Sequence, residues 1–161
     1  MNAERLRELL DYDPETGVFR WKTPIRGMRV RVGQIAGYIH LRGYRDIYIG
    51  KRKYQAHRLV WLYLYGRWPT DQIDHINGVK DDNRRENLRE ATNIENTQNA
   101  RHARRNNKTK MLGVIATPWK SFKAEIKVNG KNNYLGTFAT AEEAHAAYLS
   151  AKRLLHPTCT I

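Results

Sequence analysis

The sequence predicts a mixed α+β fold built from small antiparallel sheets and short helices. Two segments, residues 38–54 and 112–138, alternate apolar with polar side chains at the two-residue period of a half-buried strand. Two others, residues 56–66 and 140–155, space their apolar side chains three and four residues apart, which favours amphipathic helices. Apolar residues make up 40% of the 161-residue chain, which is enough for packed cores.

The first part of the chain, residues 1–54, is expected to be β-rich. Residues 3–10 predict a short helix, Pro14 and Gly17 mark a turn, and residues 18–22 begin a strand. Residues 26–53 contain eight Arg or Lys side chains and one acid, Asp46, and they alternate around glycines in a hairpin pattern. We therefore expect a small antiparallel sheet with one basic face, and we expect residues 1–54 to contact DNA through that face.

The middle of the chain, residues 55–100, is expected to hold the chemistry. Residues 56–66 predict a helix that ends at Gly66, which suits a C-terminal cap. Residues 72–83 indicate a strand, a turn at Asn77-Gly78 and a short return strand. A further helix is expected within residues 84–103, beginning near Arg85–Glu86.

A cationic linker and a second small domain are expected to follow. Residues 101–110 contain five basic side chains, no acid and no large apolar side chain, as is typical of a linker. Residues 111–161 predict three short strands, broken at Pro118 and at Asn129-Gly130, and then a helix with Thr140 as its N-cap.

The charge balance points to a polyanionic partner. Twenty-nine Lys and Arg side chains face 16 acids, a formal net charge of +13, and each phosphate that such a chain neutralises releases counterions. Cys159 stands alone, which excludes an internal disulfide and a cysteine-based zinc site. No apolar run reaches the length of a membrane span and the first residues do not resemble a signal peptide, so we expect an intracellular protein.

Four polar side chains carry the candidate chemistry. Asp74 and Asn96 offer hard oxygen ligands for a divalent cation such as Mg²⁺. His75, whose unperturbed pKa lies near neutrality, suits a general base that takes a proton from water. Asn87 is a candidate for bonding the far imidazole nitrogen of His75. A buried structural histidine paired with Asp74 is the alternative. Asn83 is interpreted as turn chemistry and His57 as structural.

The segment from His57 to Asn96, with IDHINGVKDDNRRENL at its centre, resembles the HNH endonucleases of the phage and intron-encoded homing type. That resemblance implies two strands and a helix around one metal ion (a ββα-metal core), with Asp74 and Asn96 as ligands. It also implies that His75 is the general base and that Asn87 orients it. An asparagine at position 96 favours Mg²⁺ or Mn²⁺, one per chain, over Zn²⁺.

Residues 111–156 resemble the AP2 DNA-binding domain, a three-stranded antiparallel sheet backed by a helix. Its marks here are Gly113-Val114, Trp119, the strand around Ala124, Tyr134-Leu135-Gly136-Thr137-Phe138 and the helix that follows. The resemblance implies that Glu125, Lys127 and Tyr134 face a DNA groove, with Lys123 on the same strand face. Trp119 is equally consistent with a core anchor and a DNA contact.

We therefore expect a metal-dependent, site-preferring DNA endonuclease of the homing type that nicks one strand of duplex DNA. The expected partner is double-stranded DNA, and we expect no membrane and no small-molecule substrate. The protein is expected to act on DNA as a monomer, with a dimer as the alternative. The expected location is the cytoplasm of a phage-infected bacterium. The alternative is a non-catalytic, sequence-specific DNA-binding regulator with a decayed nuclease core. Basic candidates for DNA contact are Arg84, Arg85, Arg89, Arg101, Arg104 and Arg105.

Overall fold

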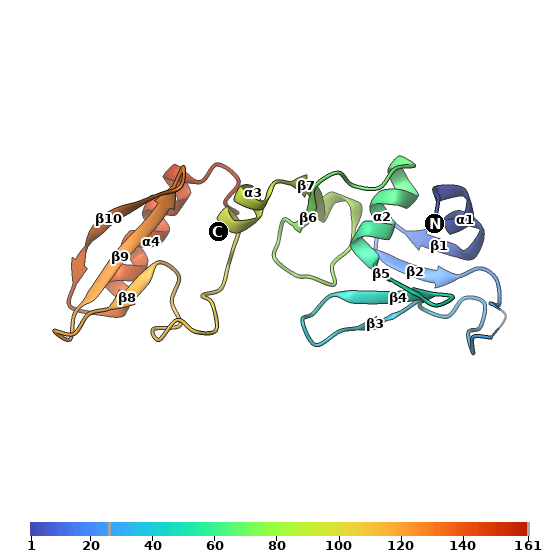
Figure 1. The fold of residues 1–161 in the computed structure, drawn as a ribbon, viewed down its shortest axis with the longest axis horizontal. Coiled ribbons are helices and arrows are strands. Elements are labelled where there is room, and N and C mark those ends of the chain that lie inside the picture. Colours follow the sequence, from blue (N-terminus) through green and yellow to red (C-terminus); the bar gives the residue numbers. More distant parts are fainter. Residues whose placement is uncertain (26, 161) are drawn as a thin grey trace. The chain divides into compact units, whose positions relative to one another are not determined.

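The computed structural model describes residues 1–25 and 27–160, which divide into two compact units, Met1–Asn93 and Ile94–Ile161. Figure 1 shows the order of helices and small sheets along the chain. None of the helices in the described residues is long and apolar enough to span a bilayer. The mixed α+β class expected from the sequence is present.

The first unit contains small two- and three-stranded antiparallel sheets around two helices. Its elements are α1 (Ala3–Leu9), β1 (Leu10–Asp13), β2 (Val18–Trp21), β3 (Tyr38–Ile39), β4 (Arg45–Ile49), β5 (Arg52–Gln55), α2 (Ala56–Tyr65), β6 (Gln72–His75), a 3₁₀ turn (Arg85–Asn87) and β7 (Leu88–Ala91). β1 pairs with β2, β4 lies between β3 and β5, and β6 pairs with β7. The helices expected at residues 3–10 and 56–66 and the hairpin expected at residues 38–54 are confirmed.

One apolar core joins the early elements to the central segment. Leu6 of α1, Phe19 of β2, Ile47 of β4 and Leu59 of α2 are fully buried in the same cluster. Ile73 and Leu88 bring β6 and β7 into contact with it. The β-rich region and the strands that carry Asp74 and His75 are therefore parts of one folded body, held together mainly by burial of apolar surface.

The prediction of a long helix from Arg85–Glu86 onward is wrong. The segment forms a single 3₁₀ turn, then strand β7, and then the short helix α3 (Asn93–Gln98). β7 pairs antiparallel with β6, with Asp74 opposite Arg89 and His75 opposite Leu88. Leu88 and Ala91 are buried by this pairing, so long-range strand pairing outweighs the local helical preference of this segment.

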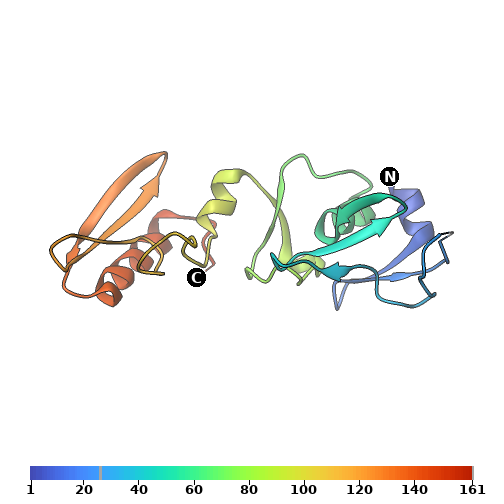
Figure 2. The same cartoon turned by 60° about the horizontal axis from the view of Figure 1, so that its bottom comes forward.

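The second unit is a three-stranded antiparallel sheet covered on one face by a helix, as Figures 1 and 2 show. Its elements are α3, β8 (Val114–Ala116), β9 (Phe122–Val128), β10 (Lys131–Phe138) and α4 (Ala141–Leu155). The order β10-β9-β8 is the antiparallel arrangement that the sequence predicts. Thr140 caps α4, and Glu143 completes a capping box with it, which satisfies amide groups at the helix start.

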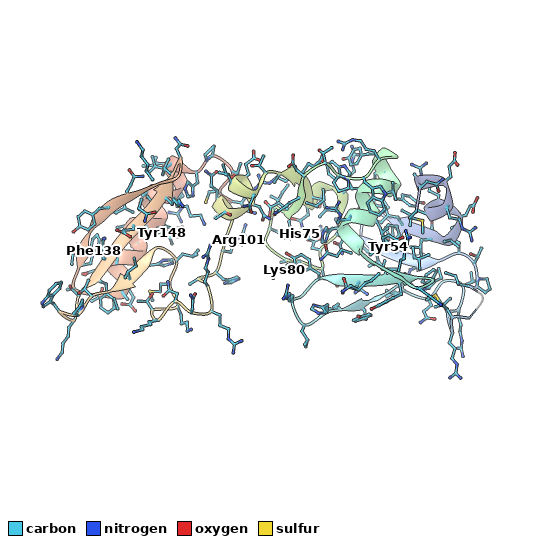
Figure 3. The ribbon with its side chains drawn as sticks, viewed as in Figure 1. Tyr54, His75, Lys80, Arg101, Phe138 and Tyr148 are labelled. Carbon is cyan, nitrogen blue, oxygen red and sulfur yellow. The ribbon has the colours of Figure 1, made fainter. Side chains whose placement is uncertain are left out.

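The core of the second unit lies between this sheet and α4. Val114, Ala124 and Ala144 are buried there, and Tyr148 of α4, which Figure 3 labels, packs on the backbone of Gly113. A Cβ at position 113 would lie 1.9 Å from the Tyr148 ring, so this contact requires glycine. The alternation along β9 is confirmed, because Ala124 and Ile126 are buried and Lys127 is exposed.

Candidate active site

The candidate site in the first unit is built on the β6–β7 hairpin. Asp74 and His75 are the last two residues of β6, and both are buried, with 7% and 4% of their surface exposed. Residues 76–87 form the loop that returns to β7. The backbone NH of Ile76 donates to the carbonyl of Asn87, which closes the base of this loop at 2.9 Å.

The imidazole of His75 meets the side chain of Asn83 across the loop. His75 Nε2 lies 3.2 Å from Asn83 Oδ1, and Asn83 is 1% exposed. The Asn83 Nδ2 group donates to the carbonyl of Asp81, which fixes the direction of the amide. Asn83 therefore does more than shape a turn, and an oxygen acceptor at Nε2 favours the tautomer with its proton on that nitrogen.

The side chain of Asn87 stabilises the same loop by hydrogen bonding to the backbone of the loop. Its Oδ1 accepts from the NH of Asn77 at 2.9 Å, and its Nδ2 donates to the carbonyl of Asp82 at 2.7 Å. The group at His75 Nε2 is thus the amide of Asn83, whereas Asn87 holds the loop that contains Asn83. The sequence does not indicate which of Asn83 and Asn87 bonds to His75, because both are amides close to the same histidine.

The first hairpin of the chain supports Asn83 from outside the loop. Tyr12 of β1 donates its hydroxyl proton to the Asn83 carbonyl at 2.9 Å. Gly17, at the β1–β2 turn, has φ +72° and packs directly on the backbone between Asn83 and Arg84. Residues far from the motif in sequence therefore fix the position of the amide that contacts His75.

Asp74 is held by an arginine on the neighbouring strand. Arg89 donates from Nε and Nη2 to Asp74 Oδ2, at 3.1 and 2.8 Å. The pair lies opposite in the β6–β7 register, and this charge-assisted contact offsets the cost of burying the Asp74 carboxylate. Arg89 thus contacts the candidate ligand Asp74, although the sequence suggested a role in DNA contact.

Two other basic candidates differ in their surroundings. Arg84 makes a two-point contact with Asp82, from Nε at 2.8 Å and Nη2 at 2.7 Å. This contact is the main reason why the pKa of Asp82 falls to about 2. Arg85, one residue on, is exposed. Arg84 therefore braces the loop, and Arg85 has the accessibility that a phosphate contact needs.

Burial controls the charge of the histidines. The pKa of His75 is lowered because burial disfavours its charged form, although the bond to Asn83 and the nearby carboxylates oppose that effect. Burial also lowers the pKa of His57, on α2, to about 3, with smaller contributions from His75 and Arg58. Burial therefore favours the neutral form of both imidazoles, which is the form that a proton acceptor needs.

The side chains that could bind a divalent metal ion are judged by the chemistry of their donor atoms. The Asp74 carboxylate is a hard oxygen ligand, and Asn96, on α3 in the second unit, offers an amide oxygen. In residues 1–25 and 27–160, no three His, Cys, Asp or Glu side chains gather to hold an ion. Carboxylate and amide oxygens are hard donors of the kind that Mg²⁺ and Mn²⁺ prefer, and these ions keep several waters and accept phosphate oxygens.

The candidate DNA-reading residues of the second unit lie on the sheet face away from α4. Lys123 forms an ion pair with Glu125 and lies over the Tyr134 ring, 5.7 Å from its centroid. Lys127 and Tyr134 are exposed, and Tyr134 lies opposite Glu125 in the register. Trp119, at the β8–β9 turn, is 84% exposed, so the core-anchor interpretation of this residue is wrong.

The basic segment, residues 101–110, lies within the second unit and contains both exposed and hydrogen-bonded arginines. Arg104 and Arg105 are exposed. Arg101 donates from Nη2 to the carbonyl and hydroxyl oxygens of Thr160, within the second unit. Arg101 therefore ties the start of this segment to the end of the same unit, and the exposed cations of the segment are Arg104, Arg105, Lys108 and Lys110.

Comparison with known proteins gives a match in this part of the chain. Residues 54–98 match the family model of the HNH endonucleases. The matched segment runs from the end of β5 to the end of α3 and contains Asp74, His75, Asn83, Asn87 and Asn96. The match supports a nuclease that acts on DNA. No curated protein and no solved structure matches the chain.

Proposed function

We propose that this protein is a metal-dependent, site-preferring DNA endonuclease of the homing type, and that it nicks one strand of duplex DNA. The observation that carries the proposal is the buried His75 imidazole, next in sequence to Asp74 and bonded to Asn83. This arrangement provides a neutral, oriented base within the segment that matches the HNH endonucleases.

In the proposed mechanism His75 takes the proton of the attacking water, and the Asn83 amide keeps the ring in one orientation. Asn87 acts on His75 through the loop that it braces. Asp74, oriented by Arg89, and Asn96 are the proposed ligands of one Mg²⁺ or Mn²⁺. When bound, such an ion supplies stabilisation of negative charge on the phosphate and on the departing oxygen.

The second unit is proposed as the reader of the DNA sequence. Its outward sheet face combines an exposed lysine, a carboxylate and an exposed tyrosine, groups that can address base edges in a major groove. Arg104 and Arg105 are proposed to contact the phosphate backbone, which positions the protein without reading sequence. Deletion of residues 111–161 should weaken site preference and leave residual nicking.

A supercoiled-plasmid assay tests the proposal. Wild-type protein should convert supercoiled plasmid to open circles with Mg²⁺ and should leave it intact with EDTA. His75→Ala should bind the same DNA and fail to nick it, whereas His102→Ala, at an exposed histidine of the basic segment, should nick normally. Binding without cleavage by the wild-type protein, with Mg²⁺ and with Mn²⁺, would favour the non-catalytic regulator.

A further inference from the structure

A second histidine lies against the proposed base and has no place in the mechanism above. His57, near the start of α2, is 5% exposed, and its ring centroid lies 5.2 Å from that of His75. The two rings meet at 85°, an edge-to-face contact. The other buried residues of α2 are Ala56, Leu59, Val60, Trp61 and Leu62, so His57 is the polar exception on the buried side of this helix.

Tyr44 completes a group of three rings from three parts of the chain. Its centroid lies 5.3 Å from that of His57 and 5.9 Å from that of His75. Tyr44 directly precedes β4, and the Lys80 amine lies over its ring, 5.0 Å from the centroid. Lys80 also donates to the carbonyl of Arg42, at 3.0 Å (Figure 3 labels His75 and Lys80).

The surroundings of the three rings are cross-linked by polar contacts. Arg45, the residue after Tyr44, makes a two-point ion pair with Asp81, with both N–O distances at 2.9 Å. Asp81 lies two residues before Asn83 in the active-site loop. The segment that contains Tyr44 and Arg45 is therefore tied by this ion pair to the loop that supplies the hydrogen bond at His75 Nε2.

The hydrogen bonding of His57 indicates what this residue contributes. His57 Nδ1 is buried, and it has no hydrogen-bond partner among the described residues. A buried polar atom without a partner costs free energy, and an apolar side chain would fill the same space without that cost. Nδ1 therefore contributes no hydrogen bond that holds the ring, and the contacts that the structure shows for this ring are those with Tyr44 and His75.

We propose that His57, together with the Tyr44 ring, fixes the plane of the His75 imidazole, which makes His57 a positioning residue of this active site. The hydrogen bond at Nε2 sets the direction of the His75 ring, and side chains that pack on the ring restrict its rotation about that bond. His57 supplies one such packing contact and Tyr44 supplies another. This inference rests on the proposed nuclease function only for its effect on the cleavage rate.

The first arm of the test measures cleavage. Nicking of supercoiled plasmid with Mg²⁺ is followed under single turnover, to obtain the maximal rate and the half-saturating protein concentration. His57→Ala should lower the maximal rate at least tenfold and change half-saturation by less than twofold. His57→Phe, which restores a ring, should recover the rate to within about threefold of wild type, because correct orientation is what the base requires.

The matched control is Leu59→Ala, a fully buried position on the same helix that is not one of the three rings. This variant removes core packing from α2, so it should lower the melting temperature at least as much as His57→Ala does. Its maximal nicking rate, measured well below its melting temperature, should stay within twofold of wild type. An equal loss of rate in Leu59→Ala and His57→Ala would overturn the positioning role.

The second arm reads the His75 ring directly and does not depend on cleavage. In protein labelled with ¹³C-histidine, the ¹³Cε1–¹Hε1 signal of His75 should be single and sharp in wild type. It should shift and broaden in His57→Ala, recover in His57→Phe and stay unchanged in Leu59→Ala. An unchanged His75 signal in His57→Ala would refute the inference. Failure of the wild-type protein to nick any DNA would refute the proposed function. The NMR measurement would then decide by itself whether His57 positions the His75 ring.

Discussion

Asp74 is the one carboxylate proposed to bind metal, and Arg89 neutralises it in the described structure. Asp74→Ala should therefore abolish metal-dependent nicking. The plasmid assay with a Mg²⁺ titration checks this, with Asp71→Ala, an exposed aspartate before β6, as the matched control. A variant that nicks at the wild-type rate when Mg²⁺ is limiting would show that Asp74 is not a ligand.

His57 also makes stability depend on pH. Its pKa is about 3 in the folded chain against 6.5 for an unperturbed histidine, so between these values the unfolded chain binds the extra proton. Stability from this group is complete above the unfolded pKa and is lost as pH falls. The free energy of unfolding of the first unit should drop by about 1 kcal/mol from His57 alone between about pH 6.5 and about pH 5.5.

The comparison that isolates this effect is wild type against His57→Phe. His75, whose pKa is also lowered by burial, contributes in the same direction in both proteins. Urea unfolding monitored by tryptophan fluorescence reports mainly on the first unit, because of the four tryptophans only Trp119 lies outside it. Parallel stability curves over this pH range for the two proteins would contradict the assignment to His57.

At the scale of elements, the β1–β2 turn acts as a support for the active-site loop. A Cβ at Gly17 would lie 2.4 Å from Arg84 N and 2.5 Å from the carbonyl carbon of Asn83. These are backbone atoms, so the loop itself would have to move. Gly17→Ala should lower the nicking rate by about tenfold or more, because Asn83 would leave its position at His75.

Gly33→Ala is the matched control for this substitution. Gly33 also has positive φ, +80°, but a Cβ there would meet nothing within 4 Å. Both variants should lose about 1–2 kcal/mol of stability from the left-handed backbone, and Gly17→Ala should lose about 1–3 kcal/mol more from overpacking. If both variants nicked at the same rate, the β1–β2 turn would have no role in placing Asn83.

The hairpins, α2 and the sheet-plus-helix of the second unit were predictable because their patterns are local. Period-2 alternation, Gly66 after α2 and Thr140 before α4 are all visible in the sequence. β7 was not predictable as a strand, because its segment has no clear alternation and its pairing with β6 is a long-range contact. In the candidate site, adjacency in sequence suggested Asp74 and His75 as a possible ligand and base. The contacts of Asn83 and His57 with His75 depend on packing and have no sequence signal.

At the scale of the whole molecule, the +13 charge should make DNA binding strongly dependent on salt. Arg104 and Arg105 are exposed, and we expect each to neutralise one phosphate. Replacing both with Ala should reduce the slope of log K against log salt by about two. Filter binding or fluorescence anisotropy over a salt series measures this slope.

Arg5→Ala provides the control for the salt experiment, because Arg5 is exposed but already paired with Glu8 at 2.6 Å. Its slope should equal that of wild type. If the double variant also kept the wild-type slope, the basic segment would lie away from the phosphates. A slope reduced equally by Arg5→Ala would mean that net charge, and not position, controls binding.

The central claim is that the His75 imidazole is the base that activates water, and chemical rescue tests it most directly. His75→Ala should bind plasmid and fail to nick it with Mg²⁺, and free imidazole added to that variant should restore nicking in proportion to its concentration. Imidazole should leave the wild-type rate unchanged. Wild-type nicking by His75→Ala without imidazole would contradict the account, because the base would then be another group.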